Sequence, residues 1–307
     1  MNDLTIAIPT YNRKERLMEQ LHSLIRQSDF DRVNVLICDN NSNYDVKLSV
    51  EKTFGLRKNV EVVKNKLNIG GDANIALLFL RCKSQWMWIL GDDDETTEDS
   101  INTILKDIEL YPNIAYFKYS IKNFTPYSDV TVKSLEEYID YYHYGNNSTG
   151  DMIFMSNNIY NLNIIGPYYK NTLINCFCRV SQLLPVFNLL MEKRGEIMFR
   201  SHPIVFYRSP EKGTAWNMLD ISIGIASLPL LNFDIDRKHY HRLMLKISRS
   251  FPHDTIVKHC LKINNRYQSK LIYRHIFRCL FKERCNFRDI LLFLAFHFLW
   301  FFRIKLN

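Results

Sequence analysis

Short apolar runs alternate with longer segments of helical periodicity through the first part of the chain. The runs have the length and composition of strands buried on both faces. We predict strands at 4–9, 33–38, 60–63, 86–90 and 114–119. Apolar residues between them recur every three or four positions, which predicts helices at 13–27, 72–82 and 97–110. This alternation predicts an α/β fold with a doubly wound, parallel sheet.

The pattern weakens after residue 120 and resumes in pieces. Residues 120–150 mix aromatic, polar and charged side chains without a period, apart from a predicted helix at 135–142, and we expect an insertion there. Further predicted elements are a strand at 151–155, a helix at 182–193, an extended stretch at 197–207 and a helix at 216–231. Because the last helix leads away from the α/β part, we predict a domain of residues 1–215 and a helical region of residues 216–307.

Polar, turn-forming clusters follow four of the predicted strands, at 10–12, 39–42, 68–71 and 91–94. Parallel strands joined by right-handed crossovers end at one edge of the sheet, so these clusters should converge there. The last cluster holds three adjacent aspartates, which repel one another and need a positive partner. Trp86 and Trp88 lie inside the preceding apolar run, so we expect them in the core. The edge is therefore the expected ligand site.

Charge is distributed unevenly along the chain. The formal net charge is +8, but residues 237–307 contain 16 Lys and Arg against 3 Asp and Glu, while residues 1–236 contain 24 against 29. A mildly acidic body is thus followed by a strongly basic tail, which suggests contact with an anionic surface, either membrane or nucleic acid. The 7 cysteines include no CxxC pair, and the chain opens without a signal-peptide pattern. We therefore expect a reduced, cytoplasmic location.

The tail has the pattern of a membrane-surface segment. Basic residues recur every four positions from Lys258 to Lys282 beside an apolar stripe. Residues 290–302 are then apolar apart from one histidine, a length too short for a bilayer span of about 20 residues. The pattern predicts an interfacial segment with aromatic anchors on an anionic leaflet. The alternative is a tail that packs on its own body or on the partner in a homodimer.

Four motifs stand at the predicted strand ends. They are IPTYNR at 8–13, CDNNS at 38–42, NIGGDAN at 68–74 and WILGDDD at 88–94. In this order and spacing they resemble the family 2 glycosyltransferases of the GT-A fold. The resemblance covers the N-terminal strands and helices, and it implies a Rossmann-like, mostly parallel sheet flanked by helices. The basic helical tail follows this catalytic fold.

The resemblance implies transfer of a sugar from a nucleotide-diphosphate sugar to a hydroxyl, with inversion. Carboxylate oxygens suit Mg²⁺ or Mn²⁺, either of which would neutralise the diphosphate. Gly91 stands where the family usually has the first Asp of its DxD motif, so Asp93 is the main predicted metal ligand, with Asp92 and Asp94 beside it. The predicted donor-binding residues are Pro9, Thr10, Tyr11, Asn12, Asp39, Gly70, Asn74, Asp92, Arg208 and Trp216.

The general base follows less directly from the resemblance. An inverting transfer needs a carboxylate close to the acceptor hydroxyl. Where the family has an acidic motif before a helix, this chain has NCFC at 175–178, without an acid. Asp151 is our predicted general base because it is the nearest strand-associated carboxylate, with Glu196 and Glu211 as alternatives.

Two further features carry implications about the diphosphate and the acceptor. The stretch 203–216 resembles the loop that family members place over the donor, and Arg208 or Lys212 would close on the diphosphate there. Similar enzymes often extend surface polysaccharides on a polyprenyl diphosphate carrier, so the predicted acceptor is a lipid-linked saccharide. A basic tail fits such an acceptor, and we expect the protein to be peripheral on the inner face of the cell membrane.

Other interpretations stay open at this point. A nucleotidyltransferase has a similar sheet, although it would ordinarily need a Gly-rich, basic loop where this chain has PTYNR. A non-catalytic protein that binds nucleic acid or another anionic surface would explain the tail, although the sequence contains no recognised nucleic-acid motif. A protein that binds donor without transfer would explain Gly91 and the missing acid. Asp39 as a turn cap, and the three aspartates as a solvated turn, are the simpler structural interpretations.

Overall fold

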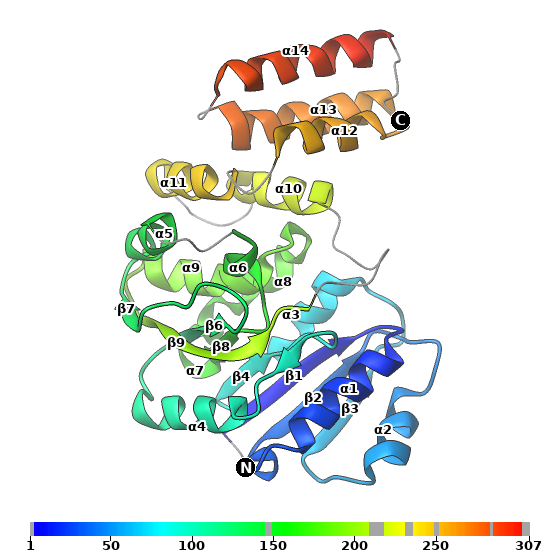
Figure 1. The fold of residues 1–307 in the computed structure, drawn as a ribbon, viewed down its shortest axis with the longest axis vertical. Coiled ribbons are helices and arrows are strands. Elements are labelled where there is room, and N and C mark those ends of the chain that lie inside the picture. Colours follow the sequence, from blue (N-terminus) through cyan, green and yellow to red (C-terminus); the bar gives the residue numbers. More distant parts are fainter. Residues whose placement is uncertain are drawn as a thin grey trace. The chain divides into compact units, whose positions relative to one another are not determined.

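The computed structural model describes residues 3–144, 149–208, 218–230, 236–248, 252–282 and 285–302. They belong to two compact units (Figure 1). The first unit comprises 1–137, 154–176 and 181–212, and the second comprises 138–153, 177–180 and 213–307. The predicted assignment of 1–215 to catalysis and of 216–307 to membrane association stays a prediction.

The first unit is built on a nine-stranded sheet with the order β3-β2-β1-β4-β8-β6-β9-β5, in which β7 pairs with β9. Its strands are β1 Leu4–Thr10, β2 Asn34–Asp39, β3 Val60–Lys64, β4 Trp86–Ile89, β5 Glu95–Thr96, β6 Tyr116–Ile121, β7 Val130–Val132, β8 Asn158–Asn161 and β9 Ile197–Phe206. The strands β1 to β4 are parallel to their neighbours in this half, whereas β8 is antiparallel to β4 and to β6. The predicted α/β fold is confirmed, and its parallel half is the part that the alternating pattern predicted.

Helices flank this sheet, and the longer ones present an apolar face to it. In α1, for example, Leu17, Leu21 and Leu24 recur at helical spacing and are buried. The helices of the first unit are α1 Lys14–Ile25, α2 Val46–Phe54, α3 Gly71–Arg81, α4 Ser100–Leu110, α7 Leu162–Ile165, α8 Tyr169–Ile174 and α9 Leu184–Met191. The helix α5 Leu135–Tyr144 begins in this unit and continues into the second.

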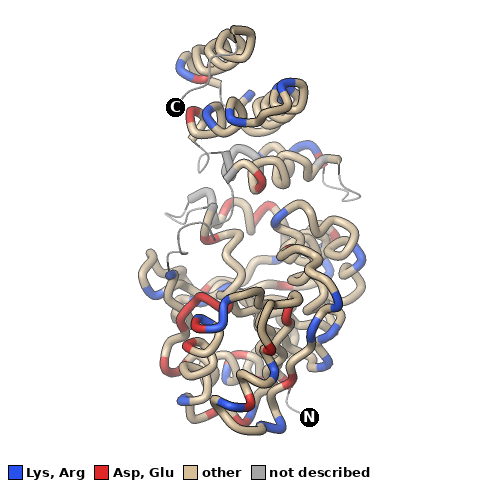
Figure 2. Tube along the Cα trace, turned by 90° about the vertical axis from the view of Figure 1, so that its right-hand side faces the viewer, with Lys and Arg blue, Asp and Glu red and all other residues tan. Residues whose placement is uncertain are grey.

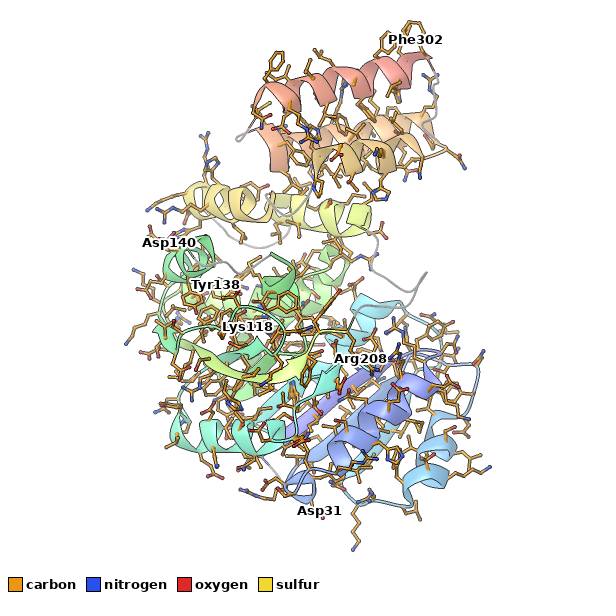
Figure 3. The ribbon with its side chains drawn as sticks, viewed as in Figure 1. Asp31, Lys118, Tyr138, Asp140, Arg208 and Phe302 are labelled. Atoms are coloured by element: carbon orange, nitrogen blue, oxygen red, sulfur yellow. The ribbon has the colours of Figure 1, made fainter. Side chains whose placement is uncertain are left out.

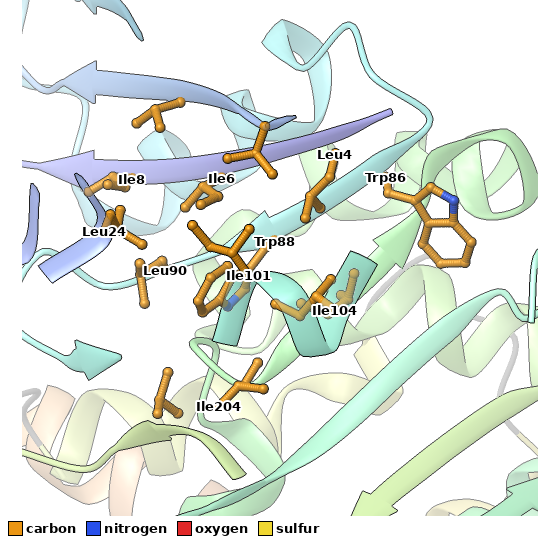
Figure 4. Close-up of a cluster of buried hydrophobic side chains, with 14 of the residues drawn as sticks. Leu4, Ile6, Ile8, Leu24, Trp86, Trp88, Leu90, Ile101, Ile104 and Ile204 are labelled. Atoms are coloured by element: carbon orange, nitrogen blue, oxygen red, sulfur yellow. The ribbon is translucent and has the colours of Figure 1, made fainter. Parts of the chain in front are cut away.

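The main core lies between the strands β1 and β4 and the helices α1 and α4 (Figure 4). Trp86 and Trp88 are both buried in it, as their place within an apolar run predicted. The Trp88 indole N–H donates to the carbonyl of Ser156 at 2.7 Å, so this large side chain has a partner for its polar atom. The core therefore holds the end of β4 in place beneath the aspartate cluster.

The prediction of a strand at 151–155 was wrong. Residues 149–153 form the helix α6 Thr149–Ile153, and the strand that pairs with β4 and β6 is β8, with the sequence NIYN. Asparagine disfavours strands, so the pattern gave no signal for β8. The fold compensates with hydrogen bonds from Lys118, whose buried ammonium donates to the side-chain oxygens of Asn157 and Asn158 at 2.6 and 2.8 Å.

The helix α2 was missed, although its N-terminus carries a signal. Asp45 is its N-cap and accepts a hydrogen bond from the Leu48 amide at 2.9 Å. The predicted helix at 182–193 is a 3₁₀ turn at Ser181–Leu183 followed by α9. Of the predicted helix at 216–231, the described part is α10 Met218–Ala226 and a 3₁₀ turn at Leu228–Leu230.

The second unit is helical and contains a buried hydrogen-bonded cluster of polar side chains. Besides α6 and α10, its helices are α11 Arg237–Ser248, α12 His253–Leu261, α13 Arg266–Ile276 and α14 Phe287–Phe302. His253 on α12 contacts Asp289 on α14 at 2.8 Å and the Tyr273 hydroxyl on α13 at 2.9 Å. One imidazole thus ties three helices together. None of the helices in the described ranges combines the length and the apolarity that crossing a bilayer requires.

Candidate active site

The parallel register brings three strand ends to one edge of the sheet. Thr10 at the end of β1 stands opposite Asp39 at the end of β2, and Asp39 stands opposite Lys64 at the end of β3. The Asn40 amide donates to the Thr10 carbonyl at 2.9 Å, which fixes the first residue beyond β2. The pairing register of β1, β2 and β3 therefore determines which side chains share this edge.

The loops that follow β1 and β2 are bound to each other. The backbone amide of Asn12 donates to the Ser42 hydroxyl at 2.9 Å. The backbone amide of Asn43 donates to the Asn12 side-chain oxygen at 2.8 Å. Asn12 has a φ of +54°, a left-handed conformation that asparagine tolerates better than most residues. The motifs IPTYNR and CDNNS thus form one rigid rim.

A cavity of about 380 Å³ lies beside this rim. It is lined by Asp39, Ser42, Asn43, Tyr44, Asp45, Val46, Lys47, Val62 and Lys64. The Asp39 side chain is fully buried, and its Oδ1 accepts a hydrogen bond from the Ser42 amide at 2.8 Å. Within the described residues its Oδ2 has no hydrogen-bond partner, although the Lys64 ammonium lies 3.8 Å away. An unsatisfied carboxylate oxygen at a cavity is an acceptor that a ligand N–H can use.

Tyr44 adds a second polar atom of this kind. Its hydroxyl is buried and finds no hydrogen-bond partner in the part of the chain that the structure describes. Burial, together with the negative charges of Asp39 and Asp92, raises the pKa of Tyr44 to about 12. The hydroxyl is therefore neutral at physiological pH and can donate a hydrogen bond.

Buried amides hold the third motif, NIGGDAN, against the second. Asn74 on α3 donates to the Cys38 carbonyl at 3.0 Å and accepts from Asn65 at 3.0 Å. The Asn40 side-chain oxygen accepts hydrogen bonds from the Asn65 side-chain amide at 2.9 Å and from the Ile69 backbone amide at 3.0 Å. Asn74 thus positions the start of α3, where its side chain is only 2% exposed. Its predicted contact with the donor stays a prediction.

The three aspartates after β4 have different environments. Asp92 is buried; it accepts from the Thr10 hydroxyl at 2.7 Å and from Arg13 Nη1 at 2.9 Å. Asp93 accepts from the same Arg13 nitrogen at 2.8 Å, and 28% of its side chain is exposed. Burial raises the pKa of Asp92 to about 6, against the lowering effect of the Arg13 charge and the Thr10 hydroxyl.

Asp94 turns back toward the sheet. Its Oδ2 accepts a hydrogen bond from the Ser156 hydroxyl, which itself accepts from the Gly91 amide at 2.8 Å. Burial raises the pKa of Asp94 to about 7, and the charges of Asp93 and Asp92 add to this rise while the Ser156 hydrogen bond opposes it. A Cβ at position 91 would lie 2.7 Å from Asp94 Oδ2, so the Asp94 carboxylate would have to shift. Gly91 thus makes room for Asp94.

The carboxylates suit a divalent cation only in part. No group of three or more His, Cys, Asp or Glu side chains in the described ranges is arranged to hold a metal ion. Asp93 nevertheless offers a partly exposed carboxylate beside Asp92, and one or two carboxylates with phosphate oxygens are the usual Mg²⁺ donor set. These residues therefore fit a metal shared with a diphosphate ligand, not one held by the protein alone.

A larger cavity of about 780 Å³ adjoins Asp94. It is lined by Glu19, Gln20, His22, Ser23, Arg26, Gln27, Ser28, Asp94, Glu95, Thr96, Glu98 and Arg208. Arg208 (labelled in Figure 3) follows β9 and donates to Glu19 on α1 at 3.1 Å. Its Nε lies 3.9 Å from Glu95 on β5. The predicted donor-loop arginine is thus ion-paired at the rim of this cavity.

The remaining predicted residues are placed as follows. Pro9 is half-buried at the end of β1, and the Tyr11 side chain is 44% exposed. Gly70 precedes α3 with a φ of +85°, which favours glycine. Trp216, Lys212 and Glu211 lie outside the described residues.

The predicted general base belongs to a different unit from the aspartate cluster. Asp151 is buried on α6 in the second unit, not on a strand. The alternative, Glu196, is in the first unit just before β9 and forms an ion pair with Lys133 at 2.6 Å. The role of Asp151 stays a prediction.

Four residues of this edge were not among the predicted site residues. Arg13 is the last residue of IPTYNR, and Lys64 directly follows the third predicted strand, so motif and strand-end position both signalled them. Tyr44 lies two residues beyond CDNNS and carried a weaker signal. Ser156 carried none, because it reaches Asp94 through the antiparallel strand β8.

A substitution at position 91 should displace Asp94. We expect Gly91→Ala to break the Ser156 hydrogen bond and to lower the free energy of unfolding by about 1–3 kcal/mol, the usual cost of overpacking. Gly71→Ala is the matched control, because a Cβ there has no neighbour within 4 Å. Urea denaturation of both variants measures the difference, and equal stabilities would contradict the steric role of Gly91.

Stability should also depend on pH through Asp94. The folded protein binds the Asp94 proton more tightly than the unfolded chain, whose carboxyl pKa is about 4, so the free energy of unfolding should fall as pH rises from about 4 to 7. Asp94→Asn removes this charge and should flatten the slope, by at most about 1.4 kcal/mol per pH unit. Denaturation in metal-free buffer tests this, with exposed Asp31→Asn as control. Parallel slopes for wild type and Asp94→Asn would show that Asp94 does not titrate in this range.

Comparison with known families gives a direct match for the part of the chain that holds this edge. Residues 5–158, half of the chain, match the family model described as glycosyl transferase family 2. The matched range contains all four motifs, from IPTYNR to WILGDDD, and also Ser156.

Curated relatives match over a shorter range. The chain is 31% identical over 101 residues to abequosyltransferase RfbV of Salmonella typhimurium, which is 32% of this chain and 30% of the relative. It is 27% identical over 110 residues to a GalNAc(5)-diNAcBac-PP-undecaprenol beta-1,3-glucosyltransferase of Campylobacter jejuni, 34% of each chain. The alignments thus span about a third of the length of these relatives.

Solved structures show the same fold over most of the chain. S. aureus TarS 1-349 in complex with UDP-GlcNAc has a TM-score of 0.61 at 14% identity, covering 91% of this chain and 81% of that chain. The mannosyltransferase PcManGT from Pyrobaculum calidifontis, in complex with GDP-Man and Mn²⁺, has a TM-score of 0.52 at 12% identity, covering 99% and 88%. These likenesses confirm the predicted GT-A type of fold, and the family match confirms the resemblance of the motifs: the chain belongs to glycosyl transferase family 2.

Proposed function

We propose that this protein is an inverting glycosyltransferase that moves a sugar from a nucleotide-diphosphate sugar to a hydroxyl group. The observation that carries the proposal is the joining of two features at one sheet edge. Thr10 stands opposite Asp39 in the strand register and donates to Asp92 at 2.7 Å, so it connects the strand end at the Asp39 cavity with the aspartate cluster. A nucleoside with its diphosphate needs both, a pocket for the base and a charged site for the phosphates.

The nucleobase fits the smaller cavity by its hydrogen-bonding chemistry. Asp39 Oδ2 would accept an N–H from the base, and the Tyr44 hydroxyl and the Lys64 ammonium are donors in the same cavity. Pro9, Thr10, Tyr11 and Asn12 would contact the nucleoside from the neighbouring end of β1. The amides at Gly70 and Gly71 open the helix α3, whose N-terminus favours a nearby phosphate.

The diphosphate would lie at Asp92 and Asp93 together with a divalent cation. Mg²⁺ or Mn²⁺ would be held by Asp93, with Asp92 beside it, and would supply charge neutralisation for the departing diphosphate. The structure of PcManGT, which has a similar fold, is a complex with GDP-Man and Mn²⁺. Asp94, the third predicted metal ligand, accepts a hydrogen bond from Ser156 next to this pair.

The transfer itself needs a general base next to the acceptor hydroxyl. The acceptor oxygen would attack the anomeric carbon, the bond from that carbon to the diphosphate oxygen would break, and the hydroxyl proton would pass to a general base. Asp151 stays our proposed base. Its burial fits a carboxylate kept away from bulk water.

The proposed acceptor is a lipid-linked saccharide in surface polysaccharide synthesis. The name of the Campylobacter relative specifies a saccharide on undecaprenol diphosphate. The second unit has a surface that suits such an acceptor, because α14 presents a continuous apolar face. Its exposed apolar residues are Phe287, Ile290, Leu291, Leu294, Ala295, Phe298, Phe301 and Phe302. At 100° per residue they occupy about 140° of the helix circumference.

Basic residues lie on the neighbouring helix α13 of the same unit. Arg266 and Lys270 on α13 both stack on the Trp300 ring, 4.7 and 4.3 Å from its centroid. In Figure 2, blue Lys and Arg positions recur along the C-terminal helices while red positions are sparse. Apolar side chains beside cationic ones are the usual composition of an interfacial helix on an anionic leaflet. We therefore propose that the protein is peripheral on the inner face of the cell membrane.

Donor binding is the central test. In a thermal-shift screen of UDP, GDP, CDP and dTDP sugars with Mn²⁺, one nucleotide class should stabilise the protein, by about 2.7 kcal/mol at 100 times its Kd. Asp39→Asn should abolish that shift, because an amide cannot offer the same acceptor at both oxygens. Asp31→Asn, at an exposed position, should leave the shift intact. Stabilisation by no nucleotide sugar, together with wild-type behaviour of Asp93→Ala, would overturn the proposed activity.

Membrane attachment has its own test. Flotation with phosphatidylglycerol-containing vesicles at low salt should recover the wild type, and Leu294→Glu/Phe298→Glu should reduce recovery by more than about tenfold, since two large apolar side chains lose their burial. The matched control is Leu56→Glu/Leu67→Glu, two exposed apolar positions of the first unit. If the wild-type protein stays in the unbound fraction at every salt concentration, this part of the proposal is contradicted.

A further inference from the structure

Arg13 occupies the middle of the aspartate cluster. It is the residue before α1, so its position depends on the turn that follows β1. Its Nη1 donates to Asp92 Oδ1 at 2.9 Å and to Asp93 Oδ2 at 2.8 Å, so one guanidinium nitrogen bridges two adjacent carboxylates. The Arg13 side chain is 29% exposed and the Asp93 side chain 28%, whereas Asp92 is buried.

Two further oxygens of the cluster accept hydrogen bonds from hydroxyl groups. Asp92 Oδ2 accepts from Thr10, and Asp94 Oδ2 accepts from Ser156. Arg13 thus bridges one oxygen of Asp92 and one oxygen of Asp93, the pair at which a cation would bind in the proposed function. A divalent ion placed there would face a guanidinium at contact distance, and like charges so close repel.

We infer that Arg13 is an internal counter-ion that competes with the divalent cation for Asp92 and Asp93 and yields when the donor diphosphate arrives. The inference rests on the metal use in the proposed function. In the free protein Arg13 neutralises the cluster and weakens the binding of a cation by itself. The diphosphate offers the guanidinium a new anionic partner, to which arginine is well suited.

The consequence is a coupling between metal and donor. A cation that must displace Arg13 binds weakly alone and more tightly once the diphosphate has taken Arg13 over. Such coupling is reciprocal, so the donor also binds more tightly in the presence of the metal. Arg13 is thus a positioning residue that makes the two bind together.

Mn²⁺ binding without turnover tests this directly. Titration of the full-length protein with Mn²⁺, followed by electron paramagnetic resonance of the free ion, gives the Kd with and without each nucleoside diphosphate. In the wild type we expect a nucleoside diphosphate to tighten Mn²⁺ binding by about tenfold or more, a typical coupling. In Arg13→Gln, Mn²⁺ alone should bind about fivefold tighter than in the wild type, and the gain from the nucleotide should shrink correspondingly.

Two further variants keep the test sharp. Arg13→Lys retains the charge but has no planar fork, so its Mn²⁺ affinity should lie between those of the wild type and Arg13→Gln. It serves as the test variant if Arg13→Gln does not fold. Arg16→Gln is the control, because Arg16 pairs with Glu19 on the same helix, and its Mn²⁺ affinity should equal that of the wild type.

The outcomes separate this inference from the proposed function. If Mn²⁺ binds the wild type in a nucleotide-dependent manner but binds Arg13→Gln and Arg13→Lys no more tightly than the wild type, the competition is overturned and the proposed metal use stands. If Mn²⁺ fails to bind the wild type with every nucleoside diphosphate, the metal proposal falls, and this inference falls with it. A gain in Arg16→Gln equal to that in Arg13→Gln would also overturn the competition, since it would reflect net charge alone.

Discussion

Negative charge gathered at one edge of the sheet is the constraint on which the candidate site depends. Four aspartates meet there, and three of them are buried. Burying a charged carboxylate costs free energy unless it is paired or hydrogen-bonded, and these aspartates are stabilised by different partners. Lys64 lies near Asp39, Arg13 bridges Asp92 and Asp93, and a serine hydroxyl supports Asp94. The raised pKa values of Asp92 and Asp94 show that these partners compensate the charge only in part. Negative charge thus remains incompletely compensated at this edge of the sheet.

The parallel half of the sheet, and with it the edge at which the candidate site residues gather, was predictable from the sequence. Apolar runs with helices between them fix the direction of β1 to β4, and the direction fixes which residues lie at the shared edge. Thr10, Asp39 and the aspartates after β4 were identified in this way because each stands at the end of such a run. Strand geometry alone located these residues at the edge, and the motifs then indicated the family.

Contacts that cross the sheet were beyond the sequence pattern. β8 consists of polar and aromatic residues, so its strand state depends on its partners β4 and β6 and on the buried Lys118, not on local propensity. Ser156 arrives at Asp94 only because β8 runs antiparallel. Likewise, nothing in IPTYNR says that the arginine turns toward residues about eighty positions away, since that choice is made by charge in the folded chain.

Gly91 and Ser156 form one steric unit although 65 positions separate them in the sequence. The serine hydroxyl accepts from the glycine amide and donates to Asp94, and the space above the glycine is filled by that carboxylate. A carboxylate at position 91, as in the more usual DxD form of the family motif, would therefore require the Asp94 carboxylate to leave its present position. The identities of residues 91, 94 and 156 are therefore coupled, because a change at one of them alters the space or the hydrogen bond that the other two use.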